Sequence, residues 1–394
     1  MPVPLDPGAY VPDPYRSIAV RGEIDERLLA ELTPEILRLQ HEERSPITVI
    51  IDSRGGSVAV AEQLERLLRA KDIDGGDPCT LITVVAGRAM SAAADLLSTG
   101  DYAYAYPGSI VHCHGIRQPW DRDITAETAS SIAEWLRSGN DQFAFTLAIR
   151  CAERFFLRFV SLRSEFPSIR ENGRKDQHNE GAAELDDLMC FVIALTDRVS
   201  PRSSELIVKA GKRYGRYQSL LNYVLCNRDK RPTARLAETE ASILRAILDF
   251  ELFSHALDPE WTLGDRGLGE IQDDFRLLMS RLSPSRYDPL NGLCKTWAPY
   301  VLSDSDQQVL QALPPDRREA ERIQLAEKTI GPAWFFLVAL CHCLQEGENE
   351  LTAADAYWIG IVDEVYGEPS LWGSRQLAEA AVNASSDSTY SETP

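Results

Sequence analysis

The sequence has little basic charge and no long apolar run, and each absence excludes a class of protein. Forty-one basic residues stand against sixty acidic ones, a net charge of −19, which disfavours nucleic acid and anionic membranes as partners. The most apolar stretch, residues 330–344, is shorter than the roughly 20 residues of a membrane-spanning helix and predicts a buried helix instead. The first fifteen residues lack the basic start and apolar core of a signal peptide.

The eight cysteines follow no spacing typical of a disulfide framework. In a chain without a secretion signal, such cysteines are expected to be reduced and mostly buried. We therefore expect a cytoplasmic protein. The pair Cys341 and Cys343 lies in the apolar stretch, which favours core packing over a metal site.

Short runs rich in β-branched residues alternate with helical patterns in the first third of the chain, which predicts an α/β domain with parallel strand pairs. The expected strands cover residues 17–22, 47–52, 79–87 and 108–113. Helical periodicity dominates from Ala126 onward, and residues 168–184 are polar enough to predict a linker. Near the end, Thr352 and Gly360 are placed to cap a short helix.

These patterns predict one α/β core that is interrupted by a largely helical insertion. The expected divisions are an extended N-terminal arm at 1–16, the first part of the core at 17–165, the insertion at 166–345, a closing helix-strand unit at 346–380 and a disordered tail at 381–394.

Two strand-to-helix turns carry candidate chemistry. IIDSRGGSV, residues 50–58, ends a strand in a glycine pair that can expose backbone N–H groups to negative charge. VVAGRAMSAAADLL, residues 84–97, places Ser91 at a helix start among small residues, where N–H donors and the helix dipole favour an oxyanion. Either motif alone also fits a structural role, a tight turn for the glycines and a helix cap for the serine.

YPGSIVHCHG, residues 106–115, places His112 and His114 on the same face of an expected strand. One of them could accept the proton of a serine nucleophile. Alternatives are a core histidine or half of a zinc site, although no well-spaced carboxylate or cysteine completes a metal centre. We expect no metal and no cofactor.

Together, these motifs resemble the Clp protease proteolytic subunit family. IDSRGGSV, AGRAMSAAADLLSTGD, YAYPGSIVHCH and the distant LTAADAYWIGIVDEV occur in the family's order, and SIAVRGEIDERLLAELTPEILRL resembles its first strand and helix. The resemblance implies the ClpP/crotonase fold, with a repeated β-β-α core. It covers residues 17–120 and 348–366, so the long helical segment lies outside it.

By this resemblance, Ser91 is the nucleophile and His114 the general base of a serine endopeptidase. It implies an oxyanion hole formed by the N–H groups of Gly55 and Ala92. The carboxylate that orients the histidine falls on Glu348, where the family usually has aspartate, and Glu346 and Glu350 stand close enough to compete.

Substrate is expected against Gly56 and Ser57. Arg54 stands where the family commonly has proline, and the family's proline shortly after the catalytic histidine is also missing, which predicts an altered alignment of the substrate.

The resemblance also implies a peptide or unfolded protein as substrate, a homo-oligomer such as a stacked ring, and an AAA+ ATPase that delivers substrates. Two alternatives stay open. The chain could be a non-catalytic subunit that binds a partner through its helical insertion, or an acyl-CoA enzyme of the crotonase type. The locally basic stretch 202–235 favours a solvated helix face or a subunit contact over nucleic acid.

Overall fold

The computed structural model describes residues 11–71, 75–117, 125–176, 185–226, 289–368 and 370–371. Its strands form one sheet and are β1 Ser17–Ile24, β2 Ile47–Gly56, β3 Leu81–Met90, β4 Tyr102–Ala105, β5 Ile110–Cys113, β6 Asn349–Thr352 and β7 Glu364–Val365. The order is β1-β2-β3-β4-β7, and β5 pairs with both β3 and β6. All these pairs are parallel except β5 with β6.

β3 changes partner along its length, and this places the candidate site. Residues 82–85 pair with β4, whereas residues 88–90 pair with β5. The final residues of β3 therefore run beside β5, the strand that carries His112, and Met90 pairs with His112. The second half of β3, with β5 and β6, forms a small extension of the sheet.

Five helical elements belong to the sheet region: η2 Pro14–Arg16, α1 Glu26–Glu42, α2 Val58–Leu68, α3 Ala92–Ser98 and α13 Ala353–Ile359. Each of the last four begins after a strand. Side chains of Asp25, Ser57 and Thr352 cap α1, α2 and α13, because each accepts a backbone N–H of the first turn. The predicted capping of α13 is confirmed at both ends, since Gly360 adopts the left-handed conformation.

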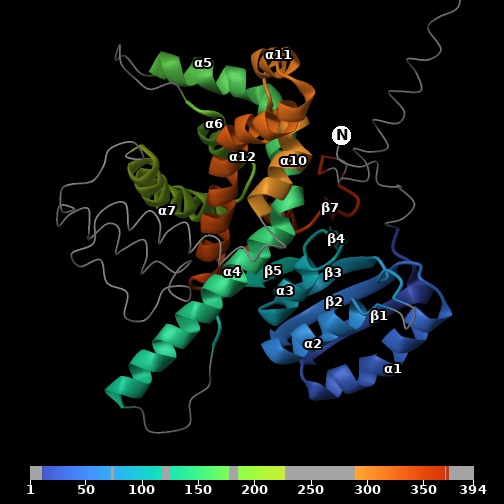
Figure 1. The fold of residues 1–394 in the computed structure, drawn as a ribbon. Helices are drawn as coiled ribbons and strands as arrows, with labels where there is room; N and C mark the ends of the chain where they lie inside the picture. Colours follow the sequence, from blue (N-terminus) through green and yellow to red (C-terminus); the bar gives the residue numbers. More distant parts are fainter. Residues whose placement is uncertain are drawn as a thin grey trace, which may run out of the picture.

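The remaining described helices are α4 Ala126–Leu162, η3 Arg163–Glu165, α5 Phe166–Asp176, α6 Asp187–Thr196, α7 Pro201–Cys226, α10 Pro289–Val301, α11 Asp304–Ala312 and α12 Pro315–Gln345. Figure 1 shows α4 running from the sheet into the helical group, where α12 crosses it. The described residues between β5 and β6 contain no strand, as the helical periodicity predicts. None of their helices is long and apolar enough to cross a bilayer.

Of two local predictions, one is wrong in part and the other is confirmed. The predicted linker at 168–184 is wrong for its first part, because α5 extends to Asp176; the rest lies outside the described residues. The apolar stretch 330–344 forms the buried end of α12, as predicted. All cysteines for which the structure describes a side chain are free and buried, so Cys341 and Cys343 serve core packing.

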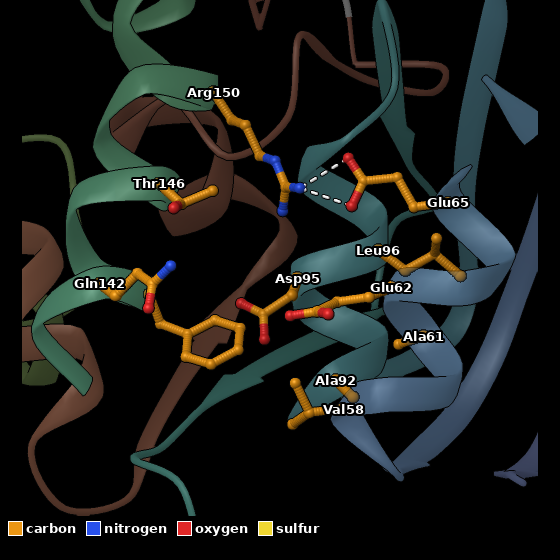
Figure 2. A pocket seen from close by; sticks show the side chains of 11 residues that line it. Val58, Ala61, Glu62, Glu65, Ala92, Asp95, Leu96, Gln142, Thr146 and Arg150 are labelled. Carbon is orange, nitrogen blue, oxygen red and sulfur yellow. Dashed lines mark hydrogen bonds and ion pairs between the residues drawn. The ribbon is translucent and has the colours of Figure 1, made fainter. Parts of the chain in front are cut away.

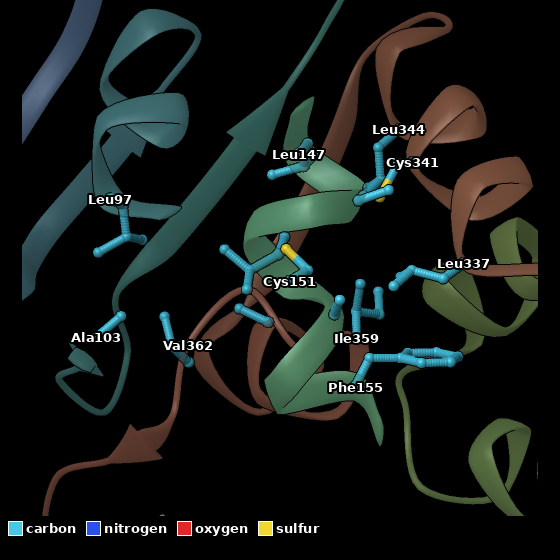
Figure 3. Close-up of a cluster of buried hydrophobic side chains, with 14 of the residues drawn as sticks. Leu97, Ala103, Leu147, Cys151, Phe155, Leu337, Cys341, Leu344, Ile359 and Val362 are labelled. Atoms are coloured by element: carbon cyan, nitrogen blue, oxygen red, sulfur yellow. The ribbon is translucent and has the colours of Figure 1, made fainter. Parts of the chain in front are cut away.

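A continuous apolar core joins the sheet to the helical segment. In Figure 3, Leu97 and Ala103 from the sheet region lie on one side of α4, and Leu337 and Cys341 of α12 lie on the other. α4 supplies residues such as Phe155 to this core, and every residue named here is at most 1% exposed. Burial of this kind is the main favourable contribution to folding.

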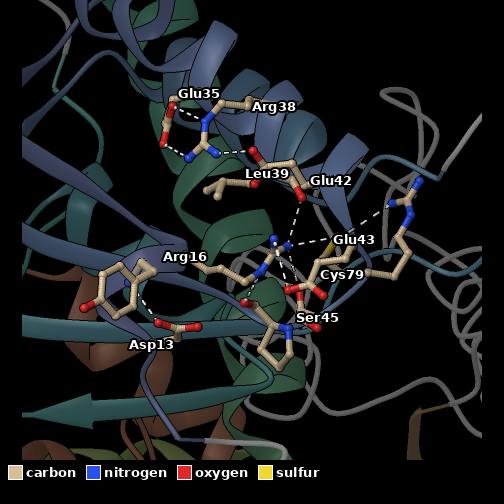
Figure 4. A network of polar contacts seen from close by, with 12 residues as sticks. Asp13, Arg16, Glu35, Arg38, Leu39, Glu42, Glu43, Ser45 and Cys79 are labelled. Atoms are coloured by element: carbon tan, nitrogen blue, oxygen red, sulfur yellow. Dashed lines mark hydrogen bonds and ion pairs between the residues drawn. The ribbon is translucent and has the colours of Figure 1, made fainter.

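Two buried arginines, Arg16 and Arg154, link the start of β1 and the segment before β7 to the rest of the fold. Arg16 donates to the carbonyls of Leu39, Glu43 and Ser45, so it ties the start of β1 to the loop between α1 and β2 (Figure 4). On α4, Arg154 Nε lies 2.6 Å from Asp363 Oδ2 and its other nitrogens reach backbone carbonyls on either side.

We predict that Arg154→Met destabilises the fold strongly. The Arg154 and Asp363 side chains are 6% and 4% exposed, and removing one partner leaves a buried charge uncompensated, at a cost of about 3–5 kcal/mol. Urea unfolding should show a clearly lower midpoint. Arg38→Met, which removes two exposed pairs on α1, is the control and should change little; equal shifts in the two variants would contradict the prediction.

Candidate active site

Ser91 occupies a strained turn between β3 and α3. Its φ of 55° and ψ of −130° make it the one non-glycine residue with positive φ in the described part of the chain. Such a conformation costs about 1–3 kcal/mol and persists only where the surroundings hold it. Here the Ser91 N–H donates to the His112 carbonyl at 2.8 Å. The Ser91 side chain makes no capping hydrogen bond, so the alternative of a helix-capping serine is wrong.

Gly55 brings the glycine turn directly against Ser91. A Cβ on Gly55 would lie 2.4 Å from the Met90 carbonyl oxygen, 2.8 Å from Ser91 Cβ and 3.2 Å from the Ala92 nitrogen. The φ of Gly55 is 88°, which independently favours glycine. Only glycine therefore permits this approach of the β2–α2 turn to the turn that holds Ser91.

The two expected oxyanion donors are the N–H groups of Gly55 and Ala92. They differ in whether they already donate a hydrogen bond. The Gly55 N–H donates to Ser53 Oγ at 3.0 Å, and that hydroxyl in turn donates to the Gly22 carbonyl. Ala92 is the first residue of α3, where backbone N–H groups have no partner within the helix. An oxyanion that uses Gly55 must therefore replace Ser53 as the acceptor.

The predicted substrate contacts lie at the same edge. Gly56 lines an open hollow of about 480 Å³ together with Gly55, Arg54 and residues from β1 and β3. Ser57 has a structural role at this edge, because its N–H donates to the Ile24 carbonyl and its hydroxyl caps α2.

The two histidines share a face of the chain, as the strand period predicts. Their ring centroids lie 5.7 Å apart. His114 Nδ1 lies 2.6 Å from the Gly115 carbonyl oxygen, and a carbonyl can only accept, so Nδ1 carries the proton. His114 Nε2 is then the nitrogen that can accept a proton. Burial and the nearby His114 lower the pKa of His112.

Glu348 reaches the histidine pair through His112. Its Oε2 lies 3.1 Å from His112 Nε2, and its other oxygen pairs with Arg117. The structure thus places the carboxylate on His112, whereas the resemblance assigns it to His114. Glu346 points elsewhere, since it pairs at 2.7 Å with both Lys209 and Arg213 of α7.

The residues described contain no group of three or more histidine, cysteine or acidic side chains that could hold a metal ion. The geometry at this edge is a serine on a strained turn, backbone N–H groups beside it, His112 on the adjoining strand β5 and His114 directly after that strand. This arrangement suits nucleophilic attack with proton transfer to an imidazole.

The Clp protease family model matches residues 13–133. Over this segment the chain is similar to the Clp protease family. The match includes Ser91, the glycine turn and both histidines, and it ends within α4. No curated protein matches the sequence. The predicted α/β fold class with a helical insertion is confirmed by this match and by the element order.

Sequence reasoning missed two features of the candidate site. The first is Arg117, which holds Glu348. The second is Asp95, which lines a cavity with Ala92. A charged residue within the small and apolar run AAADLL was the available signal, because acidic side chains are rarely placed among buried neighbours without a function or partner.

We predict that Gly55→Ala disturbs the structure more than Gly22→Ala does. Both glycines have positive φ, so both alanines carry the left-handed penalty of about 1–2 kcal/mol. A Cβ on Gly22 meets nothing within 4 Å, whereas one on Gly55 meets Ser91, which adds about 1–3 kcal/mol of overpacking. Unfolding midpoints in urea measure the difference, and indistinguishable midpoints would show that the turn is not held tightly against Ser91.

Proposed function

We propose that this Clp protease domain is a serine endopeptidase that cleaves peptide bonds through an acyl-enzyme on Ser91. The observation that carries the proposal is the strained Ser91 turn, whose side chain has no capping role and which Gly55 approaches too closely for any other residue. Strain of this kind, without a structural use for the hydroxyl, is typical of functional sites.

In the proposed mechanism, Ser91 Oγ attacks the scissile carbonyl carbon while His114 Nε2 takes the hydroxyl proton. The Ala92 and Gly55 N–H groups hold the resulting oxyanion, the latter after leaving Ser53 Oγ. Collapse breaks the C–N bond, and the leaving amine takes the proton from His114. Water then attacks the ester with His114 again as the base, which releases the acid product and restores Ser91.

The Gly115 carbonyl supplies the orientation of His114, because it accepts the Nδ1 proton at 2.6 Å. We propose that Glu348 provides the negative charge that stabilises the imidazolium, with His112 and Arg117 fixing its position. This role needs a held carboxylate and does not require Glu348 to take the proton.

A second candidate function is a latent or non-catalytic subunit that binds partners through its helices. Two observations favour it: Glu348 contacts His112 rather than His114, and the Gly55 N–H is already occupied by Ser53. The Gly55 N–H must leave Ser53 before it can hold an oxyanion, so an unreactive Ser91 in a folded oligomer would support this candidate.

We predict that a neutral fluorophosphonate probe labels Ser91 of the full-length protein. Mass spectrometry of the modified peptide identifies the residue, and Ser91→Ala should remove the label. His114→Ala should slow labelling by about 10²- to 10⁴-fold, as expected for loss of a general base. His112→Ala is the matched control and should slow it less, since the His112 ring pairs with Glu348 and the alanine keeps the backbone carbonyl that holds Ser91.

A folded protein that is never labelled would contradict the peptidase proposal. Equal losses in the two histidine variants would contradict the assignment of His114 as the base.

We also propose that the protein acts as a homo-oligomer on peptide or unfolded protein substrates, with an AAA+ ATPase as a partner. The far half of α4 supports an interface, because it projects from the sheet region (Figure 1) and its Trp135 is 54% exposed. Native mass spectrometry should give multiples of the 43.9 kDa chain, and a monomer alone would refute the oligomer.

A further inference from the structure

A cavity of about 100 Å³ lies beside the first turn of α3. Residues of α2, α3 and α4 line the cavity. One of these residues is Ala92, which directly follows Ser91 in the sequence. A single buried water needs only about 10–15 Å³ measured in this way, so the cavity has room for a side chain. Ser91 does not line the cavity itself, and Ala92 is the lining residue next to it in the sequence.

The lining changes in character along the cavity. Figure 2 shows Val58 and Ala92 at one end, the pair Glu65 and Arg150 at the other, and Asp95 between them. Asp95 lies three residues beyond Ala92 on the helix, a rise of about 4.5 Å. A side chain that enters past Ala92 thus meets small apolar groups first and a carboxylate further in.

The cavity is lined by more negative than positive side chains: Glu62, Glu65 and Asp95 against Arg150. Arg150 is already committed, because one of its nitrogens lies 2.6 Å from each oxygen of Glu65. Glu62 has an exposed contact with Arg66 at 3.7 Å. The Asp95 carboxylate accepts no hydrogen bond from any residue that the structure describes; burial raises its pKa to about 6, while the charge of Arg150 lowers it.

A half-buried carboxylate that lacks a hydrogen-bond donor is costly to dehydrate further, and a cation offsets that cost. A leucine side chain in this cavity would displace water from Asp95 and leave it without a donor. A lysine or arginine side chain would pack its apolar stem against Ala92 and Val58 and bring its charged head to Asp95.

We propose that this cavity is a specificity pocket for a lysine or arginine side chain adjacent to the scissile bond, with Asp95 as its charge partner. The inference rests on the proposed peptidase function and adds to it a substrate class. It predicts cleavage after basic residues.

The test uses three probes on the full-length protein, and Ser91 modification is read by mass spectrometry. A neutral fluorophosphonate reports whether Ser91 reacts at all. Two peptidyl diphenyl phosphonates, identical except for lysine or leucine next to the phosphorus, report the pocket. The lysine probe should react at least tenfold faster than the leucine probe, and Asp95→Asn should lower this ratio about tenfold while the neutral probe still reacts.

Glu35→Gln is the matched control, because it removes one carboxylate on α1 outside the cavity and should leave the ratio unchanged. A faster leucine probe on the wild-type protein, or a ratio that Asp95→Asn does not change, would overturn the pocket proposal alone. Failure of all three probes to modify Ser91 would overturn the peptidase function and this inference with it.

Discussion

The buried contact between Arg154 and Asp363 is the constraint on which the rest of the structure depends. Asp363 follows Arg154 by 209 residues, and the contact with Arg154 holds it at the sheet together with its hydrogen bonds to Ala103. Arg154 bonds the Asp363 carboxylate and the Gly100 carbonyl at once, and Arg158 adds the Asp363 carbonyl. A guanidinium has five donors in a rigid plane, so a single side chain can join three segments in this way.

This tether explains why the long helical insertion does not disrupt the core. α4 leaves the sheet region, carries both arginines and packs against α12, whose end returns the chain to β6. Loop-closure cost grows slowly with length, so the insertion is tolerated once its two ends are held together. The return of the chain from α12 to β6 also places Glu348 beside His112 of β5.

The candidate site combines local strain with close backbone approach. Ser91 is held in its unusual conformation by the His112 carbonyl on one side and by the Gly55 turn on the other. The Asp95 carboxylate, which accepts no hydrogen bond from the described residues, lies one helical turn from Ser91, so a substrate that pairs with it would bind next to the proposed nucleophile. The strained Ser91 turn and the Asp95 carboxylate each lower the stability of the folded state. Neighbouring destabilising features of this kind are typical of binding and catalytic sites.

Much of this molecule followed from the sequence alone, because the responsible signals are local. Strand runs bounded by glycine, the position of Ser91 at a helix start, the shared face of His112 and His114 and the caps of α13 each depend on residues within one turn or strand. The predicted linker failed in part because polarity does not by itself prevent a helix, as α5 shows.

What only the tertiary structure decided are the contacts between distant segments. The pairing of Glu348 with His112, the diversion of Glu346 to α7 and the meeting of Asp95 with α2 and α4 join residues that no periodicity relates. Residue types and spacing determined which groups are present and which local conformation they adopt. Packing of α4 and α12 against the sheet determined which of those groups meet.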